Sequence, residues 1–246
     1  MAEQKKTSWF ARWGFVIVGW GTAAAVVAGW GSRTNLWPFG FGFRLLAWAV
    51  AAIAIGVLFS LIGAIATRGG KKRGRILAIL GVLVGLLVAG SPSWYVWKAR
   101  DLPAIHDIST DTDNPPAFSA ITPLRRGLPN PVEYGGEEIA DQQHRAYPDI
   151  QPLLMHAPVA HAFEHVLEAA REMGWDIVDA NPAQGRLEAT ATTFWFGFKD
   201  DVVVRVSPTE TGSRIDVRSL SRVGRSDIGA NARRIRAYLA ILAAAP

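Results

Sequence analysis

Long uncharged apolar runs dominate the first hundred residues. Three of them, residues 13–30, 45–67 and 76–97, contain no Asp, Glu, Lys or Arg. A helix needs about 20 apolar residues to cross a bilayer, and each run is close to that length. Trp and Tyr cluster at the ends of the runs, at the depth that amphipathic rings prefer. The pattern therefore predicts three transmembrane helices.

The charges between these runs predict their direction. The loop TRGGKKRGRI (residues 67–76) carries five basic residues and no acid, and Lys5, Lys6 and Arg12 precede the first run, whereas the other loop has only Arg33 and Arg44. The positive-inside rule then places the N-terminus and the KKRGR loop in the cytoplasm. We expect a multi-pass protein of the bacterial cell (inner) membrane, with everything after about residue 100 in the periplasm.

Small residues recur at four-residue spacing in the runs. They are Gly21, Ala25 and Gly29, then Ala52 and Gly56, then Gly81 and Gly85. Such faces let helices approach closely, either within one three-helix bundle or between copies in a homo-oligomer. No run has an ionisable residue near its middle, which disfavours a transporter or channel. Residues 1–98 are therefore interpreted as a three-span anchor or docking surface.

The periodicity changes after residue 99. Residues 99–151 are rich in Pro, Asp, Thr and Gly, which indicates an extended strap with one short helix near 137–145. From residue 152 the pattern becomes regular, with helical spacing over 158–173. Short strands are predicted next, at 175–179, 186–193, 193–198, 201–206 and 214–219. A last helix is predicted over 226–244, with an apolar stripe of Ile228, Ile235, Leu239 and Leu242. This order predicts an α+β two-layer sandwich, an antiparallel sheet with two main helices, inside an extracytoplasmic domain of residues 99–246.

The last predicted strand, RIDVRS, alternates polar and apolar residues. Ile215 and Val217 are expected to face the core, and Arg214, Asp216 and Arg218 are expected to face water. The hairpin turn PTETG would then place Arg205 opposite Asp216.

Charge is distributed unevenly between the two regions. Residues 1–100 hold 12 basic residues and one acid, and residues 101–246 hold 14 basic residues and 20 acids. The net positive charge of the chain thus comes from basic residues that flank apolar runs. This arrangement is typical of a membrane protein and does not favour a nucleic-acid partner. The chain has no Cys, which excludes disulfides and thiolate metal ligands.

Three segments carry a resemblance to a known family. They are IHDISTDTDNPPAF (105–118), TFWFGFKDDVVVRV (193–206) and SRVGRSDIGANARRIRAYL (221–239). In this order, behind apolar spans, they resemble the bacterial "domain of unknown function 1499" family, from about residue 100 onward. The resemblance implies one domain that begins at the Asp-rich strap, and it implies no catalytic residues.

Two motifs suggest metal chemistry. HAFEH (161–165) has the H-x-x-E-H form of an inverted zinc-peptidase site, but His161 and His165 lie opposite the apolar stripe of their helix and fit a solvated face better. IHDISTDTDNPPAF resembles a calcium loop, but positions six and twelve from Asp107 are Thr112 and Phe118 where an EF-hand has Gly and Glu. An irregular calcium site is left open, and neither motif makes us predict a metal or a cofactor.

The best candidate site joins the strap to an Arg-rich segment. Seven Arg lie between residues 214 and 236, and Gly224 with Ser226 or Asp227 predicts a turn and a helix N-cap. We expect Asp107 and Asp111 to lie near Arg222, Arg225 and Ser226, where the anion is either the strap's own carboxylates or an external phosphate such as a lipid headgroup.

The aromatic cluster FWFGF (194–198) has two interpretations. It is either a core element that covers the seam between helices and sheet, or a patch that contacts a ligand or a membrane.

The sequence favours a non-enzymatic integral membrane protein. Its extracytoplasmic domain would bind a partner protein or an anionic envelope lipid, with membrane lipid, protein or a second copy as partners and no nucleic acid. The alternative is an envelope hydrolase that uses the acidic strap or a metal at HAFEH. Motifs typical of nucleotide cofactors and Ser nucleophiles, G-x-x-x-x-G-K-[ST], G-x-G-x-x-G and G-x-S-x-G, are missing from the sequence.

Overall fold

The computed structural model describes residues 6–70 and 72–244. The chain forms two compact units, one of Met1–Arg100 with Phe194–Gly197 and one of Asp101–Thr193 with Phe198–Pro246. We call them the helical unit and the domain. Lys5 and Lys71, two of the cations used to predict the membrane direction, lie outside the described residues.

Three helices make up the helical unit: α1 (Trp9–Arg33), α2 (Phe39–Ala66) and α3 (Arg75–Ala99). Each contains one of the uncharged runs and extends beyond it at both ends, except that α2 stops one residue short of Thr67. Helix α1 begins where Ser8 Oγ accepts a hydrogen bond from the backbone N–H of Ala11. All three are long and apolar enough to cross a membrane.

Small residues let these helices pack closely. A Cβ added at Gly63 of α2 would lie 2.6 Å from the backbone nitrogen of Ala11, and one added at Gly56 would lie 2.9 Å from that of Val18. Gly21 is equally close to the Ile53 side chain. Several of the small residues therefore pack against neighbouring helices of the same unit. A homo-oligomer formed through small residues stays a prediction.

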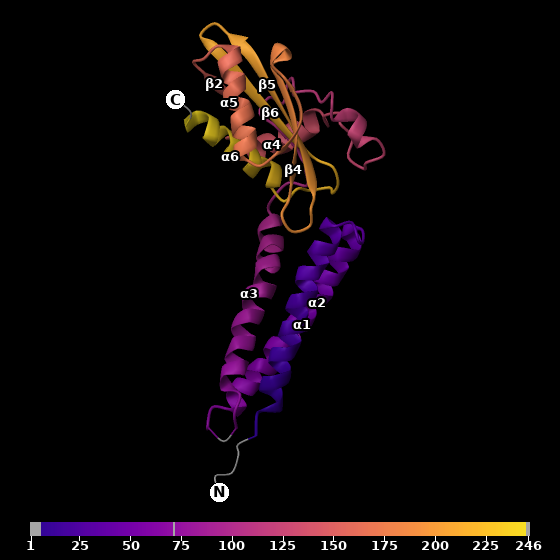
Figure 1. The fold of residues 1–246 in the computed structure, drawn as a ribbon, viewed down its shortest axis with the longest axis vertical. Coiled ribbons are helices and arrows are strands. Elements are labelled where there is room, and N and C mark those ends of the chain that lie inside the picture. The colour runs from indigo at the N-terminus through magenta and orange to yellow at the C-terminus, as the bar shows by residue number, and fades with distance from the viewer. Residues whose placement is uncertain (1–5, 71, 245–246) are drawn as a thin grey trace. The chain divides into compact units, whose positions relative to one another are not determined.

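The domain is a six-stranded antiparallel sheet with helices. Its elements are β1 (Asp107–Ser109), α4 (Glu137–Ala146), β2 (Leu153–Met155), α5 (Val159–Glu172), β3 (Asp176–Asn181), β4 (Arg186–Thr192), β5 (Lys199–Thr209), β6 (Gly212–Ser221) and α6 (Ala230–Ala244), with short 3₁₀ turns at Thr122–Arg125 and Pro182–Gln184. The strand order is β1-β6-β5-β4-β3, and β2 pairs with the same edge of β6 as β1. Figure 1 shows α5 and α6 on one face of this sheet. The α+β architecture is confirmed.

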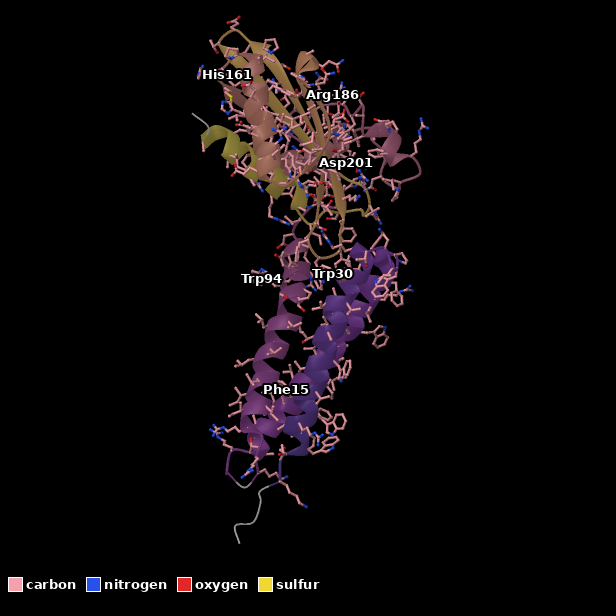
Figure 2. All side chains as sticks on the ribbon, in the orientation of Figure 1. Phe15, Trp30, Trp94, His161, Arg186 and Asp201 are labelled. Carbon is pink, nitrogen blue, oxygen red and sulfur yellow. The ribbon has the colours of Figure 1, made fainter. Side chains whose placement is uncertain are left out.

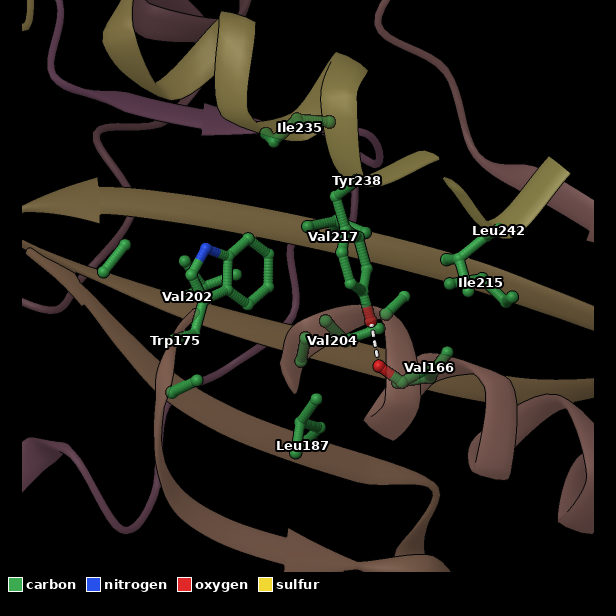
Figure 3. Close-up of a cluster of buried hydrophobic side chains, with 14 of the residues drawn as sticks. Val166, Trp175, Leu187, Val202, Val204, Ile215, Val217, Ile235, Tyr238 and Leu242 are labelled. Carbon is green, nitrogen blue, oxygen red and sulfur yellow. Dashed lines mark hydrogen bonds between the residues drawn. The ribbon is translucent and has the colours of Figure 1, made fainter. Parts of the chain in front are cut away.

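The apolar core lies between the sheet and these two helices. Val204 of β5 pairs with Val217 of β6, so alternate residues of both strands point toward α5 and α6. Tyr238 of α6 donates a hydrogen bond from its hydroxyl to the Val166 carbonyl at 2.6 Å and stacks on Trp175 (Figure 3). Burial of the Tyr238 side chain raises the pKa of its phenol well above the usual value.

Two local predictions were wrong. Residues 193–198 are not a strand, because β4 ends at Thr192 and Gly197 adopts a φ of +70° that turns the chain. Phe194–Gly197 group with the helical unit, where the Phe196 ring lies 4.9 Å from that of Phe43. Ile228 is not part of the last helix, since it has a φ of +53° and α6 begins at Ala230.

Candidate functional site

The second face of the sheet is polar, yet it is buried. We call it the strap face; it carries Glu188 and Thr190 of β4, Asp201 and Arg205 of β5, and Asp216 and Arg218 of β6. Asp216 is 1% exposed and Arg218 is 3% exposed, although the sequence predicted a face in contact with water. The cause is the strap, which in the structure begins at Asp101 because α3 extends to Ala99, and whose side chains and backbone contact these groups. Burial of charge is tolerated only where each group is paired, so the contacts decide what this face can do.

Asp201, which is labelled on the sheet of the domain in Figure 2, is the centre of one cluster on the strap face. Its side chain is 0% exposed and its carboxylate accepts hydrogen bonds from Arg125 at 2.6 Å, Arg222 at 2.8 Å and the Thr190 hydroxyl at 2.8 Å. Arg125 belongs to the strap, and its guanidinium also donates to the carbonyls of Asn130 and Ser221, both at 3.0 Å. This cluster joins the strap to the ends of β5 and β6.

Glu188 holds a turn of the strap through backbone groups. Its Oε1 accepts the N–H groups of Ser119 at 2.8 Å and Ala120 at 3.1 Å, and its Oε2 accepts that of Ile121 at 2.8 Å. Arg186 Nε lies 3.0 Å from the same carboxylate. Three backbone N–H groups of the strap thus converge on this carboxylate, so Glu188 acts as an anchor for the strap.

Asp107 forms a bidentate ion pair with Arg218, whose Nε lies 2.9 Å from Oδ1 and whose Nη2 lies 2.7 Å from Oδ2. The same guanidinium donates to the Val132 carbonyl at 2.7 Å and lies 5.4 Å from the centre of the Tyr134 ring. Burial, together with the charge of Asp107, raises the pKa of the Tyr134 phenol. Asp107 is therefore enclosed by its partners.

Asp111 forms a four-membered cluster with β5 and β6. Its Oδ2 accepts from Arg205 at 2.9 Å and from Arg214 at 3.0 Å, and both guanidinium groups also contact Asp216. Arg205 pairs with Asp216 across the two strands, as the sequence predicted.

The expected contacts of Asp107 and Asp111 with Arg222 and Arg225 differ from those in the structure. Strand β1 pairs with β6 so that Asp107 is opposite Leu220, which brings its carboxylate to Arg218 on the same face. This register depends on residues more than 100 positions apart, which no local pattern reveals. Of the partners that sequence reasoning missed, Arg214 and Arg218 had a signal, because the alternation of RIDVRS placed both on the polar face of their strand.

Arg222, Arg225 and Ser226 lie where β6 leaves the sheet. Arg222 is committed to Asp201, and its backbone N–H donates to the Lys199 carbonyl at 3.1 Å. Ser226 Oγ accepts from the Ile228 N–H at 3.2 Å. Arg225 is exposed, and its carbonyl lies 3.4 Å from a ring nitrogen of His106.

Asp227 provides the N-terminal cap that the sequence assigned to either it or Ser226. Its carboxylate accepts the N–H groups of Gly229 at 2.8 Å and Asn231 at 2.7 Å. Burial raises the pKa of Asp227, while these two hydrogen bonds oppose the rise.

Three exposed cations surround this end of the sheet. We call Lys199, Arg225 and Arg233 the basic edge. None of them has an ion pair with the described residues, whereas Asp200 nearby is buried and paired with Arg234. A shallow cavity of about 340 Å³ lies beside Arg233, lined also by Gly174, Thr192, Thr193 and Ala230. The charge and the hydroxyl groups of this edge suit an anion.

The HAFEH motif lies on α5. His161 and Glu164 are exposed, and the rings of His161 and His165 are 6.3 Å apart and nearly perpendicular. Within residues 6–70 and 72–244 there is no group of three His, Cys, Asp or Glu side chains that could hold a metal ion. The motif therefore lacks the third ligand that a zinc site needs among these residues.

Comparisons with known proteins agree with the resemblance in the three quoted segments. A search of curated proteins found no match. The family model described as "Protein of unknown function (DUF1499)" matches residues 107–242, from β1 to the last turns of α6. This match covers more than half of the chain and nearly all of the domain, and the chain therefore belongs to the DUF1499 family.

Proposed function

We propose that the chain is a multi-pass protein of the bacterial inner membrane whose periplasmic domain binds anionic lipid headgroups through the basic edge. Two features support the membrane part. Three helices have the length and composition of membrane spans, and the cation-rich loop between α2 and α3 predicts which side is cytoplasmic.

The observation that carries the binding part is the imbalance of charge at the basic edge. Asp200 is buried and paired with Arg234, and Asp227 is engaged as the cap of α6, while Lys199, Arg225 and Arg233 are exposed. A cation that has no ion pair with a carboxylate keeps its charge available for an external phosphate, and several such cations together attract an anionic surface.

The chain's connectivity adds a second argument. Asp101, Thr193 and Phe198 are the points where the domain is covalently joined to residues of the helical unit. Thr193 and Phe198 directly flank β4 and β5 at the end of the sheet that carries the basic edge. Lys199 of the basic edge therefore lies only two residues along the chain from a segment of the helical unit.

The strap face gives the hydrolase alternative no comparable support. The carboxylates of Glu188, Asp201 and Asp216 are buried and engaged by Arg side chains or backbone N–H groups. An acid or base that serves catalysis has to reach a substrate, which enclosed ion pairs cannot do.

Hydrogen exchange of the full-length protein tests the proposal. We expect residues 222–234 to exchange more slowly in nanodiscs that contain phosphatidylglycerol than in neutral phosphatidylcholine nanodiscs. The variant Arg225→Glu/Arg233→Glu should abolish this difference, and added salt should reduce it, because exposed charges are screened. The control is Arg145→Glu/Arg171→Glu, which makes the same charge change at exposed arginines of α4 and α5. Equal exchange of the unmodified protein in the two lipids would refute the proposal.

A further inference from the structure

Helices α2 and α3 are in close contact over only part of their length. Gly81 and Gly85 of α3 face Ser60 and Val57 of α2 with no room for a Cβ. Figure 1 shows the two helices diverging toward the end of α3.

The divergence leaves a groove of about 570 Å³ within the helical unit. Its walls include Phe43, Leu46 and Val50 of α2 and Val96 and Trp97 of α3, and Arg100 lies at its end. The exposed fractions of Val96 and Trp97, 60% and 57%, show how open the groove is.

The polar groups on the α3 wall of the groove form hydrogen bonds within α3 itself. Pro92 has no N–H, and the Val88 carbonyl that would have accepted it instead accepts from Ser91 Oγ at 3.3 Å. Ser93 Oγ donates to the Ala89 carbonyl at 2.8 Å. The surface offered between Pro92 and Trp97 is therefore suited to hydrocarbon.

The groove lies in the second half of α3. The midpoint of the uncharged run 76–97 falls between residues 86 and 87, so at about 1.5 Å per residue Pro92 lies about 8 Å and Arg100 about 20 Å from the middle of the bilayer. Half of a bilayer's hydrocarbon core is about 15 Å, so the Arg100 guanidinium reaches headgroup depth.

From these features we propose that the groove binds one phospholipid, with an acyl chain between α2 and α3 and its phosphate on Arg100. Arg100 has no ion pair with the part of the chain that the structure describes, and a guanidinium matches the geometry of a phosphate. The inference rests on the proposed insertion of the helices in a membrane.

A second copy of the chain fits the groove less well than a lipid. The first 100 residues contain only one acid, Glu3, so the spans of another copy bring no carboxylate to Arg100. The groove walls are also bulky, whereas tightly packed membrane helices meet at small residues.

Native mass spectrometry of the full-length protein in mild detergent with added phosphatidylglycerol tests the inference. We expect one bound phospholipid per chain, and about tenfold weaker retention in Arg100→Ala, the loss of one charge-assisted interaction. Ala47→Trp, which fills the groove, should lower retention at least as much. Leu87→Trp adds the same ring at a position of α3 that is 74% exposed, and should retain the lipid.

Two outcomes would overturn the inference. One is unchanged retention in both Ala47→Trp and Arg100→Ala, and the other is a lipid-free dimer that Ala47→Trp dissociates. Because Arg100 is exposed, its variant keeps the test valid if Ala47→Trp fails to fold. The lipid proposal for the basic edge is judged separately, by exchange at residues 222–234.

Discussion

Replacing Asp201 by Asn tests whether buried ion pairs hold the strap on the sheet. The substitution keeps the size of the side chain and removes its charge. Arg125, whose side chain is 2% exposed, and Arg222, at 17%, would then share a buried site without their carboxylate. Arg125 would keep its contacts to two backbone carbonyls, which cannot neutralise it.

The expected loss of stability is large. Removing one partner of a buried ion pair costs about 3–5 kcal/mol, because the other charge stays buried. For a protein of this size, each kcal/mol lowers the melting temperature by about 2–4 °C, so we expect a decrease of about 6–20 °C in the unfolding of the domain.

A matched exposed pair provides the control. Asp149 receives hydrogen bonds from Nε and Nη2 of Arg236, the same two nitrogens through which Arg222 contacts Asp201, but the side chain of Asp149 is 56% exposed. Contacts of that kind contribute at most about 1 kcal/mol, so Asp149→Asn should be nearly neutral.

Pulse proteolysis of the full-length protein in detergent, over a urea series, measures both variants. Exchange of the strap amides between residues 119 and 131 localises the effect. If Asp201→Asn costs no more than Asp149→Asn, burial does not strengthen the cluster and the reasoning about the strap is wrong.

Two further predictions concern the helical unit and the cap of α6. Gly63→Ala should lower the melting temperature of the protein in detergent, because the new Cβ would clash with the Ala11 backbone, and such overpacking costs about 1–3 kcal/mol. The control Gly19→Ala should not lower the melting temperature, because no atom lies within 4 Å of the added Cβ. Because burial raises the folded-state pKa of Asp227, its favourable contribution is complete below the usual Asp pKa of about 3.9 and is lost as pH rises through the folded value. Urea midpoints should therefore fall over that range in the unmodified protein relative to Asp227→Asn, and parallel profiles would contradict this.

Local sequence patterns predicted most elements of the fold. Helix α5 ends where expected because Gly174 adopts a φ of +69°, and β5 and β6 meet at the predicted turn. Uncharged runs located the three long helices for the same reason, since length and apolarity are properties of a segment by itself. The loop of residues 194–197 was mistaken for a strand because large aromatics favour strands unless a nearby Gly turns the chain.

The strap face was mispredicted for a different reason. Alternation showed that Asp216 and Arg218 share one face of β6, and polar residues on a strand usually indicate contact with water. Whether another segment covers that face depends on contacts such as Glu188 with Ser119, which are 69 residues apart. Alternation gives the orientation of a side chain, and burial follows only from the packing of distant segments.

The structure divides the arginines of the Arg-rich segment into those paired with a carboxylate and those without such a pair. Five of its seven Arg have carboxylate partners: Arg214, Arg218, Arg222, Arg234 and Arg236. Arg225 and Arg233 have none among the described residues, and both lie at the basic edge. In the sequence all seven look alike, because the pairing is set by register. Arg233 donates a hydrogen bond to the Ile228 carbonyl at 2.9 Å, but neither of these two charges is neutralised by a carboxylate ion pair among the described residues. The lipid proposal therefore rests on them and not on Arg222.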